Sequence, residues 1–216
     1  MKLLSCTRRL ALLGGLGILS GTAFAAPTTY WGAGNAAVAN PTTYSFVATG
    51  NGSVTAYFAG QTAGYGSVVG MSVNGAAPGT FGLQNHVATY GNSLILGSVL
   101  AGDVITFILN VSQDPAGPRP LNYVWSSDPT KNSDAMNHVY SNAYTGDAQI
   151  PAGTYVGFED LPQGGDNLYG QDFDYDDHQF VFTGPFEARA TPDGGSTIAL
   201  LGLTSLGMMA IRSRRK

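Results

Sequence analysis

The chain has 216 residues, of which 44% are hydrophobic and only 11% are charged, and its formal net charge is −4. This composition excludes an intrinsically disordered chain, and the length is enough for one domain with a substantial core. Seven of the ten Lys and Arg lie at the two ends, so residues 26–193 carry three basic residues against all 14 acidic ones, a net charge of −11. So acidic a body excludes nucleic acid as a partner, because phosphate binding needs a basic surface.

The first 25 residues have the features of a secretory signal peptide. A basic start precedes an apolar run over residues 10–19, and Ala23 and Ala25 have the spacing that signal peptidase requires. We therefore expect signal peptidase to remove residues 1–25 and the rest of the chain to be exported. The single cysteine, Cys6, would leave with the signal, so the mature chain would have neither a disulfide nor a thiolate nucleophile.

The body of the chain, residues 41–190, follows a flank at 26–40 and has the pattern of an all-β domain. Short runs rich in Val, Ile, Thr, Tyr and Phe alternate with Gly, Asn, Asp and Pro about every eight to twelve residues, which is typical of a β-sandwich or jelly roll. No run in the body has the period of an amphipathic helix, and no internal repeat is present. The strands are expected at 43–49, 53–59, 66–73, 93–99, 103–111, 121–125, 138–144, 154–158 and 178–183.

The sequence predicts the type of two connections in this body and the face of one strand. The first two strands flank Gly50-Asn51-Gly52, which predicts a β-hairpin turn because Asn-Gly tolerates positive φ. In the first strand Tyr44, Phe46 and Ala48 would share one face, since alternate residues of a strand do. The segment 114–120 contains three prolines and is expected to be a loop.

An acidic segment lies near the end of the body. Seven carboxylates fall within 19 residues, and no Lys or Arg occurs between residues 132 and 188. Mutual repulsion would destabilise such a segment without a counter-ion, and calcium suits it because calcium takes oxygen ligands and needs neither His nor Cys. The candidate metal ligands are Glu159, Asp160, Asp166, Asp172, Asp174, Asp176 and Asp177. The alternative is a solvated acidic turn that keeps an extracellular protein soluble.

The spacing of three of these residues excludes an EF-hand. Asp172, Asp174 and Asp176 alternate as in a calcium loop, but Asp177 stands where an EF-hand needs Gly and Thr183 where it needs Glu. In an extended chain the three alternating side chains would point to one side.

The same segment contains the runs Gly157–Pro162, Gly164–Asp166 and Asp174–Asp177, followed by Phe180, and Asp134–His138 lies upstream. In this order the runs resemble the signature GFEDLPGGGDxDYNDxxF of a family of exported bacterial domains of unassigned function, which an Asp-Gly-x-Asn-His element often precedes. The chain departs from the signature by an insertion around 167–171 and by Asp176 where Asn is usual. The resemblance implies a β-sandwich-like exported domain whose acidic residues bind metal or catalyse a reaction, and it brings no agreed activity.

Residues 191–216 divide into a turn motif at 191–196, an apolar stretch at 197–211 and a basic tail at 212–216. As a helix the apolar stretch would span about 22 Å, short of the roughly 30 Å hydrocarbon core, so it is a marginal membrane helix whose basic tail would stay in the cytoplasm. This design resembles the PEP-CTERM class of sorting tails in its VPDSG-like variant. The sorting motif would be Pro192, Asp193, Gly194 and Gly195.

The resemblance of the tail implies a location and a processing partner. An exosortase-type transpeptidase would recognise the tail while its helix is transiently anchored in the cytoplasmic membrane. The body would then reside in the cell envelope, at the cell surface or in the extracellular matrix. The alternative is an ordinary C-terminal anchor that is never processed.

The sequence contains no readable catalytic constellation, and we name no catalytic residue. The nearest approach to a nucleophile elbow, Gly70–Asn74, lacks the final Gly, and His86, His138 and His178 do not have zinc-site spacing. Two of seven carboxylates would form a glycosidase-like pair by chance, so this signal has little specificity. His178 directly follows the acidic run and is expected to be its pH-sensitive neighbour.

Three functions stay open at this point. We favour a non-catalytic structural or adhesive domain stabilised by calcium, ahead of a module that binds extracellular polysaccharide and, last, a hydrolase. Aromatic residues that could stack on sugars are Tyr30, Trp31, Tyr65, Tyr90, Tyr123, Trp125, Tyr140 and Tyr144. Core packing is the more frequent explanation for a lone Trp such as Trp125. A sugar-binding module should show coplanar exposed aromatics, and a hydrolase a deep cleft with two convergent carboxyls.

Overall fold

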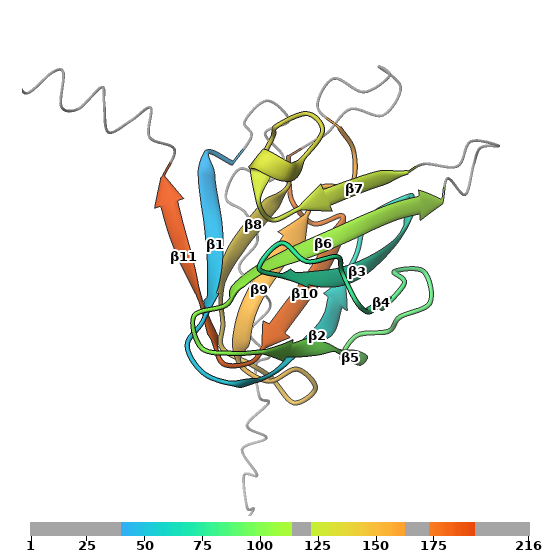
Figure 1. Cartoon of the computed structure of the whole chain (residues 1–216). Coiled ribbons are helices and arrows are strands. Elements are labelled where there is room, and N and C mark those ends of the chain that lie inside the picture. The colour runs from blue at the N-terminus through green and yellow to red at the C-terminus, as the bar shows by residue number, and fades with distance from the viewer. Residues whose placement is uncertain (1–39, 114–121, 163–172, 193–216) are drawn as a thin grey trace, which may run out of the picture.

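The computed structural model of the chain describes residues 40–113, 122–162 and 173–192 (Figure 1). These residues form two antiparallel sheets and one short 3-10 helix, η1 at Pro129–Lys131, so the expectation of an all-β domain is confirmed. No helix in this described part is long and apolar enough to cross a membrane. The predicted signal peptide, most of the N-terminal flank, the proline-rich loop and the apolar tail lie outside the described residues.

The first sheet contains six strands, in the order β11-β1-β6-β3-β4 with β7 also paired to β6. Their bounds are β1 Thr42–Ala48, β3 Gly66–Val73, β4 Phe81–Gly82, β6 Val104–Gln113, β7 Tyr123–Ser126 and β11 Phe186–Pro192. The long strand β6 organises this sheet, because β3 pairs along one edge of it while β1 and β7 share the other edge.

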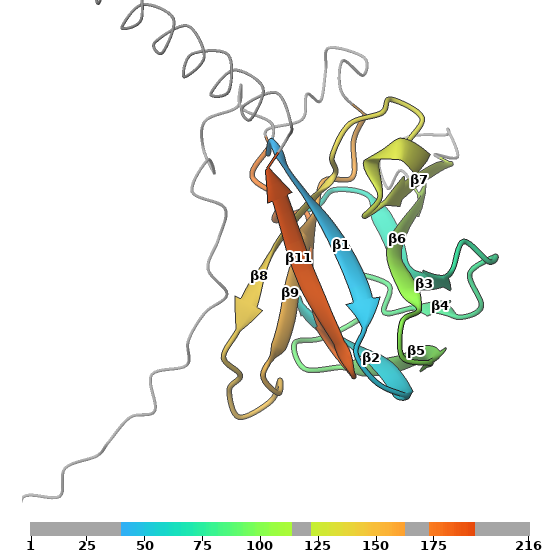
Figure 2. The same cartoon turned by 60° about the vertical axis from the view of Figure 1, so that its left-hand side comes forward.

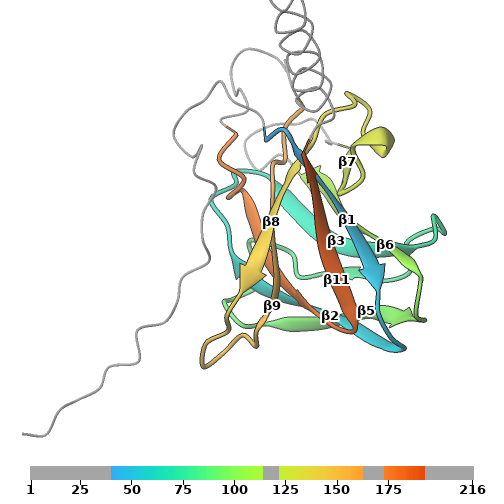
Figure 3. The same ribbon diagram turned by 90° about the vertical axis from the view of Figure 1, so that its left-hand side faces the viewer.

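The second sheet contains five strands, in the order β5-β2-β10-β9-β8. Their bounds are β2 Gly52–Gly60, β5 Ser93–Val99, β8 Val139–Tyr144, β9 Gly153–Phe158 and β10 His178–Thr183. Strand β11 lies at one end of its sheet and β8 at one end of the other, and Figures 2 and 3 show these two strands on the same side of the domain.

The two sheets share one hydrophobic core. Phe107 of the first sheet stacks on Phe182 of the second, with ring centroids 3.7 Å apart, and both side chains are fully buried. Phe46 and Ala48 are buried and Tyr44 is half-buried against the same cluster, which confirms that these three residues share a face. Burial of aromatic side chains of this size is the main source of stability, because each removes about 150–250 Å² from water.

The predicted hairpin between the first two strands is wrong. β1 belongs to the six-stranded sheet and β2 to the five-stranded sheet, so the Gly50-Asn51-Gly52 turn carries the chain from one sheet to the other. The N–H groups of Thr49 and Gly50 both donate to the carbonyl oxygen of Pro185, at 2.7 and 3.3 Å. This distant residue fixes the path of the turn, and β1 takes β11 and β6 as its neighbours.

The nine strands expected from the sequence are present, each within two residues of the expected bounds. Two strands were not predicted from the sequence: the two-residue strand β4, and β11, which pairs with β1 at seven positions. Strand β11 runs through Thr191 and Pro192, so it includes two residues that we had assigned to the sorting segment.

Candidate functional site

The acidic signature lies where β9 ends beside the start of β10. Glu159 and Asp160 directly follow β9, and their side chains are almost completely buried, at 1% and 2% exposure. The N–H of Glu159 donates to the carbonyl oxygen of His138 at 3.0 Å, which continues the β8–β9 pairing by one residue. Both carboxylates therefore lie inside the domain, where a charged group is stable only with hydrogen-bond partners.

The Glu159 carboxylate holds a tight turn in place. Its Oε1 accepts a hydrogen bond of 2.7 Å from the N–H of Tyr175. Phe173 and Tyr175 both have φ of 55°, a left-handed backbone conformation that residues other than glycine rarely adopt. The bond to Glu159 offsets part of the cost of this backbone conformation, since charge-assisted hydrogen bonds are stronger than neutral ones.

The side chain of Tyr175 also holds this turn in place. Its ring is buried, and its hydroxyl donates to the carbonyl oxygen of Asn137 at 3.3 Å and accepts from the N–H of Asn40 at 2.8 Å. Its carbonyl oxygen lies directly over Gly157, where an added Cβ would be only 2.1 Å away. Gly157 is therefore required by the close approach of the turn to strand β9.

A second pair of hydrogen bonds joins Asp160 to the start of β10. Asp177 Oδ2 accepts from the N–H of Asp160 at 3.1 Å, and His178 Nε2 lies 3.3 Å from Asp160 Oδ2. The indole N–H of Trp125 donates to the Asp160 carbonyl oxygen at 2.7 Å. His178 is fully buried next to the acidic run, so its predicted position as a neighbour of these carboxylates is confirmed.

The Trp125 ring packs on the His138 ring. The two ring centroids are 3.7 Å apart and the planes differ by 7°. His138 Nε2 lies 3.0 Å from Asp134 Oδ2, and Nδ1 lies 3.2 Å from the carbonyl oxygen of Glu159. Burial lowers the pKa of His138, and the hydrogen bond with Asp134 opposes that change. Both ring nitrogens have partners, so His138 is a structural residue whose hydrogen bonds are satisfied.

Asp174 and Asp176 belong to the turn and not to an extended segment. Asp174 Oδ1 accepts from the N–H of Asp176 at 3.1 Å, and the Thr62 hydroxyl donates to Asp176 Oδ1. The Thr62 N–H also donates to the Asp176 carbonyl oxygen at 3.2 Å, which ties the turn to the connection after β2. Burial raises the pKa of Tyr155 above its ordinary value of 10.0, and the negative charge of Asp176 adds to that rise.

We name the arrangement of Gly157, Glu159, Asp160, Tyr175 and Asp177 the carboxylate lock. Of the seven candidate metal ligands, Asp166 and Asp172 lie outside the described residues. The structure brings Glu159, Asp160 and Asp177 together in the lock, and Asp174 and Asp176 lie in the turn that it holds. Within the described ranges, no group of three His, Cys, Asp or Glu side chains is arranged to hold a metal ion.

The structural roles of Gly157 and Tyr175 were not predicted from the sequence, nor was the hydrogen bond from Trp125 to Asp160. Gly157 and Tyr175 belong to the signature, so their positions in it were a usable signal. The contact of Thr62 with the turn has no signal in the sequence, because 114 residues separate Thr62 from Asp176.

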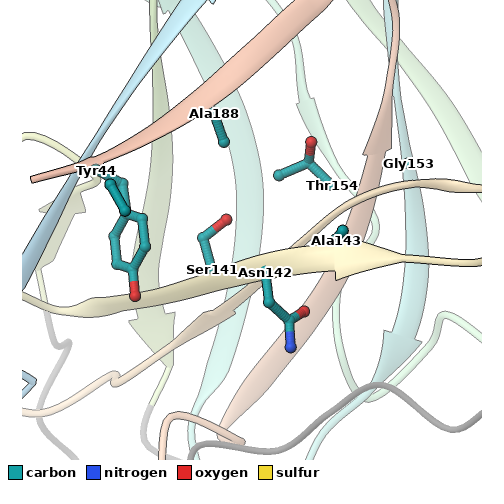
Figure 4. A pocket seen from close by; sticks show the side chains of 8 residues that line it. Tyr44, Ser141, Asn142, Ala143, Gly153, Thr154 and Ala188 are labelled. Carbon is teal, nitrogen blue, oxygen red and sulfur yellow. The ribbon is translucent and has the colours of Figure 1, made fainter.

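Two surface clefts lie elsewhere on the domain. One of about 270 Å³ lies between β8 and β11 and is lined mainly by small side chains, among them Ser141, Ala143 and Ala188 (Figure 4). The other, of about 390 Å³, lies along β1 and β6 and includes one carboxylate, Asp128. Neither cleft has the two convergent carboxyls that a glycosidase needs.

The aromatic residues considered for sugar stacking have diverse environments. Trp125 is fully buried and Tyr144 nearly so, which supports core packing for both. Tyr90 is 37% exposed, and its hydroxyl is bonded to Tyr144 and Asp147. Tyr30 and Trp31 lie outside the described residues.

Comparisons of the chain with protein-family models, with curated proteins and with solved structures found no match.

Proposed function

We propose that this chain is an exported β-sandwich domain of the cell envelope or extracellular matrix, with a structural or adhesive role and no catalytic activity. The observation that carries this proposal is the use of the signature carboxylates. Glu159 and Asp177 accept hydrogen bonds from the backbone N–H groups of Tyr175 and Asp160, and Glu159 and Asp160 are buried. A carboxylate that holds two backbone segments together inside the domain is not placed to meet a substrate.

Two features of the sequence support export and sorting. Residues 1–25 have the pattern of a signal peptide, and residues 191–216 have that of a PEP-CTERM-like tail. On this proposal signal peptidase acts at one end and an exosortase-type transpeptidase at the other, with the cytoplasmic membrane as a transient anchor.

Calcium is the cofactor we propose for the acidic segment. Asp174 and Asp176 lie close together in the turn, and their negative charges also raise the pKa of Tyr155. No Lys or Arg occurs between residues 132 and 188 to balance these charges. The described residues do not by themselves form a group of three His, Cys, Asp or Glu ligands, so backbone carbonyl oxygens, water, or Asp166 and Asp172 would complete the shell of the ion.

A melting experiment tests the calcium proposal on the full-length chain. The melting temperature is measured with millimolar calcium, with magnesium and with a chelator. An ion that binds only the folded state stabilises it by about 2.7 kcal/mol at a hundredfold excess over Kd, so calcium should raise the melting temperature by roughly 5–10 °C. Magnesium should do much less, because it demands a tighter octahedral shell.

Matched variants locate the ion. The variant Asp174→Asn/Asp176→Asn should lose the calcium response, while Asp128→Asn/Glu187→Gln, which removes two carboxylates outside the segment, should keep it. If the wild-type chain melts at the same temperature in calcium and in chelator, the calcium proposal is wrong. A response that survives Asp174→Asn/Asp176→Asn would place the ion elsewhere, around Glu159, Asp160 and Asp166.

A further inference from the structure

Strand β11 forms an outer edge of the six-stranded sheet. All seven of its residues pair with β1, and no strand in the described part of the chain pairs with its other edge. Residues 187–191 are exposed, on both faces of the sheet. Figure 3 shows β11 along the side of the domain, next to β1. A long exposed edge strand of this kind is a template for pairing with another strand.

The backbone of this edge is directed outward at alternate residues. Thr49 N–H donates to the Pro185 carbonyl oxygen, while the N–H and C=O of Ala48 bond with Asp103 and Gly102 on the opposite side of β1. Hydrogen-bonded and non-hydrogen-bonded pairs alternate along an antiparallel ladder. With the observed register, the backbone groups of Ala188 therefore point away from β1, as do those of Ala190.

The side chains of β11 divide by face. Ala188 lies opposite Phe46 and Ala190 opposite Tyr44, so these two small residues face the inner side of the sheet. Glu187 and Arg189 are on the outer side, where Arg189 Nε donates to Glu187 Oε1 at 2.7 Å. The strand thus carries one negative and one positive side chain, placed symmetrically about Ala188.

We propose that β11 pairs antiparallel with β11 of a second copy of this chain, about a twofold axis that passes through Ala188. In this register Ala188 lies opposite Ala188 of the second copy, and the two exchange backbone hydrogen bonds. Glu187 then lies opposite Arg189 of the second copy, and twofold symmetry repeats this pair. Both are non-hydrogen-bonded positions, where facing side chains come closest.

The charges also select this register over its neighbours. An axis moved by one residue would pass through Glu187 or Arg189 and place like charges directly opposite each other, which is destabilising. Pro192 has no N–H to donate, so the ladder would end before it. A closed twofold pair uses the same edge on both copies, and leaves no β11 edge open for further addition.

A charge-reversal experiment tests the proposal with the full-length chain in a mild detergent. Sedimentation should show that the wild-type chain dimerises. Glu187→Arg and Arg189→Glu should each weaken dimerisation about tenfold or more, because each places like charges opposite one another across the axis. Val124→Arg, at an exposed position on β7, should dimerise like the wild type. Circular dichroism should show that all three variants are folded.

Mixing the two reversed variants gives the decisive result. An equimolar mixture of Glu187→Arg and Arg189→Glu should recover dimerisation, because opposite charges then meet at both positions between the copies. Residues 187 and 189 keep like charges within each chain, so the recovery cannot come from an intramolecular ion pair. A monomeric wild type overturns the proposal, as does a dimer that charge reversal leaves unchanged. If the wild-type chain is monomeric and binds an extended peptide along β11, the proposal is also overturned, and the partner of this edge is a peptide.

Discussion

The contact between Gly157 and the Tyr175 carbonyl oxygen gives a quantitative prediction for Gly157→Ala. The new Cβ would lie 2.1 Å from that oxygen, more than 1 Å closer than ordinary van der Waals contact. The turn would have to move outward by about 1 Å, which would break the 2.7 Å bond from Tyr175 N–H to Glu159. Overpacking costs about 1–3 kcal/mol and an unpaired buried N–H about 1–3 kcal/mol. We expect a total loss of about 2–6 kcal/mol in the free energy of unfolding.

Urea unfolding of the full-length chain measures this loss. The fluorescence of Trp125 reports on it directly in a Trp31→Phe background, because Trp125 is buried beside the lock and the chain has only two tryptophans. Gly64→Ala is the matched control, since an added Cβ there meets no atom within 4 Å. Both changes restrict the unfolded chain equally, so the difference between them isolates the steric effect. A difference under 1 kcal/mol would refute the role assigned to the lock.

A variant of Glu159 separates charge from hydrogen bonding within the same assay. Glu159→Gln keeps a side-chain oxygen that can accept from Tyr175 N–H, whereas Glu159→Ala removes the acceptor. The Ala variant should therefore be less stable than the Gln variant by about 1–3 kcal/mol.

Two further predictions concern acid stability and processing. Hydrogen bonds from the Tyr90 hydroxyl and from backbone N–H groups lower the pKa of Asp147 below its ordinary value of 3.8. The ionised carboxylate therefore stabilises the folded state above pH 3.8, and this stabilisation is lost as the pH falls through the pKa of the folded state. Asp147→Asn should therefore flatten the acid side of the stability profile, and an unchanged slope below pH 3.8 would contradict this assignment. Intact-mass measurement of envelope-associated protein should find a chain that lacks residues 1–25, and a chain that retains them would argue against the proposed signal peptide.

Local pattern was enough to place most strands but not to assign them to sheets. The alternation of Tyr44, Phe46 and Ala48 follows directly from one buried face. β11 also alternates, but beyond Phe186 its inward-facing residues are only Ala188 and Ala190, and residues 187–191 are exposed, so the strand has no strong apolar stripe. The Asn-Gly turn was misjudged because turn residues report local φ, while the sheet to which a strand belongs depends on partners as distant as Pro185.

The sequence identified the acidic residues of the site but did not predict which of them are buried. The seven acidic residues suggested a cation site or a solvated turn, since isolated carboxylates favour water. Their sequence does not show that Glu159 and Asp160 are buried, because burial arises where the end of β9 meets the turn at 173–177. The backbone N–H groups that bond to these carboxylates occur at every residue, so no side-chain pattern predicts them.

The pairing of β1 with β11 has a consequence for the order of folding. These strands are the first and last in the described chain, and 148 residues separate Thr43 from Thr191. A chain made or exported from its N-terminus therefore presents β1 long before its neighbour exists. Until then one edge of β1 lacks its partner strand, and the final closure has a high contact order, which slows folding. A ribosome or translocon would hold this domain incomplete until its last strand had passed through.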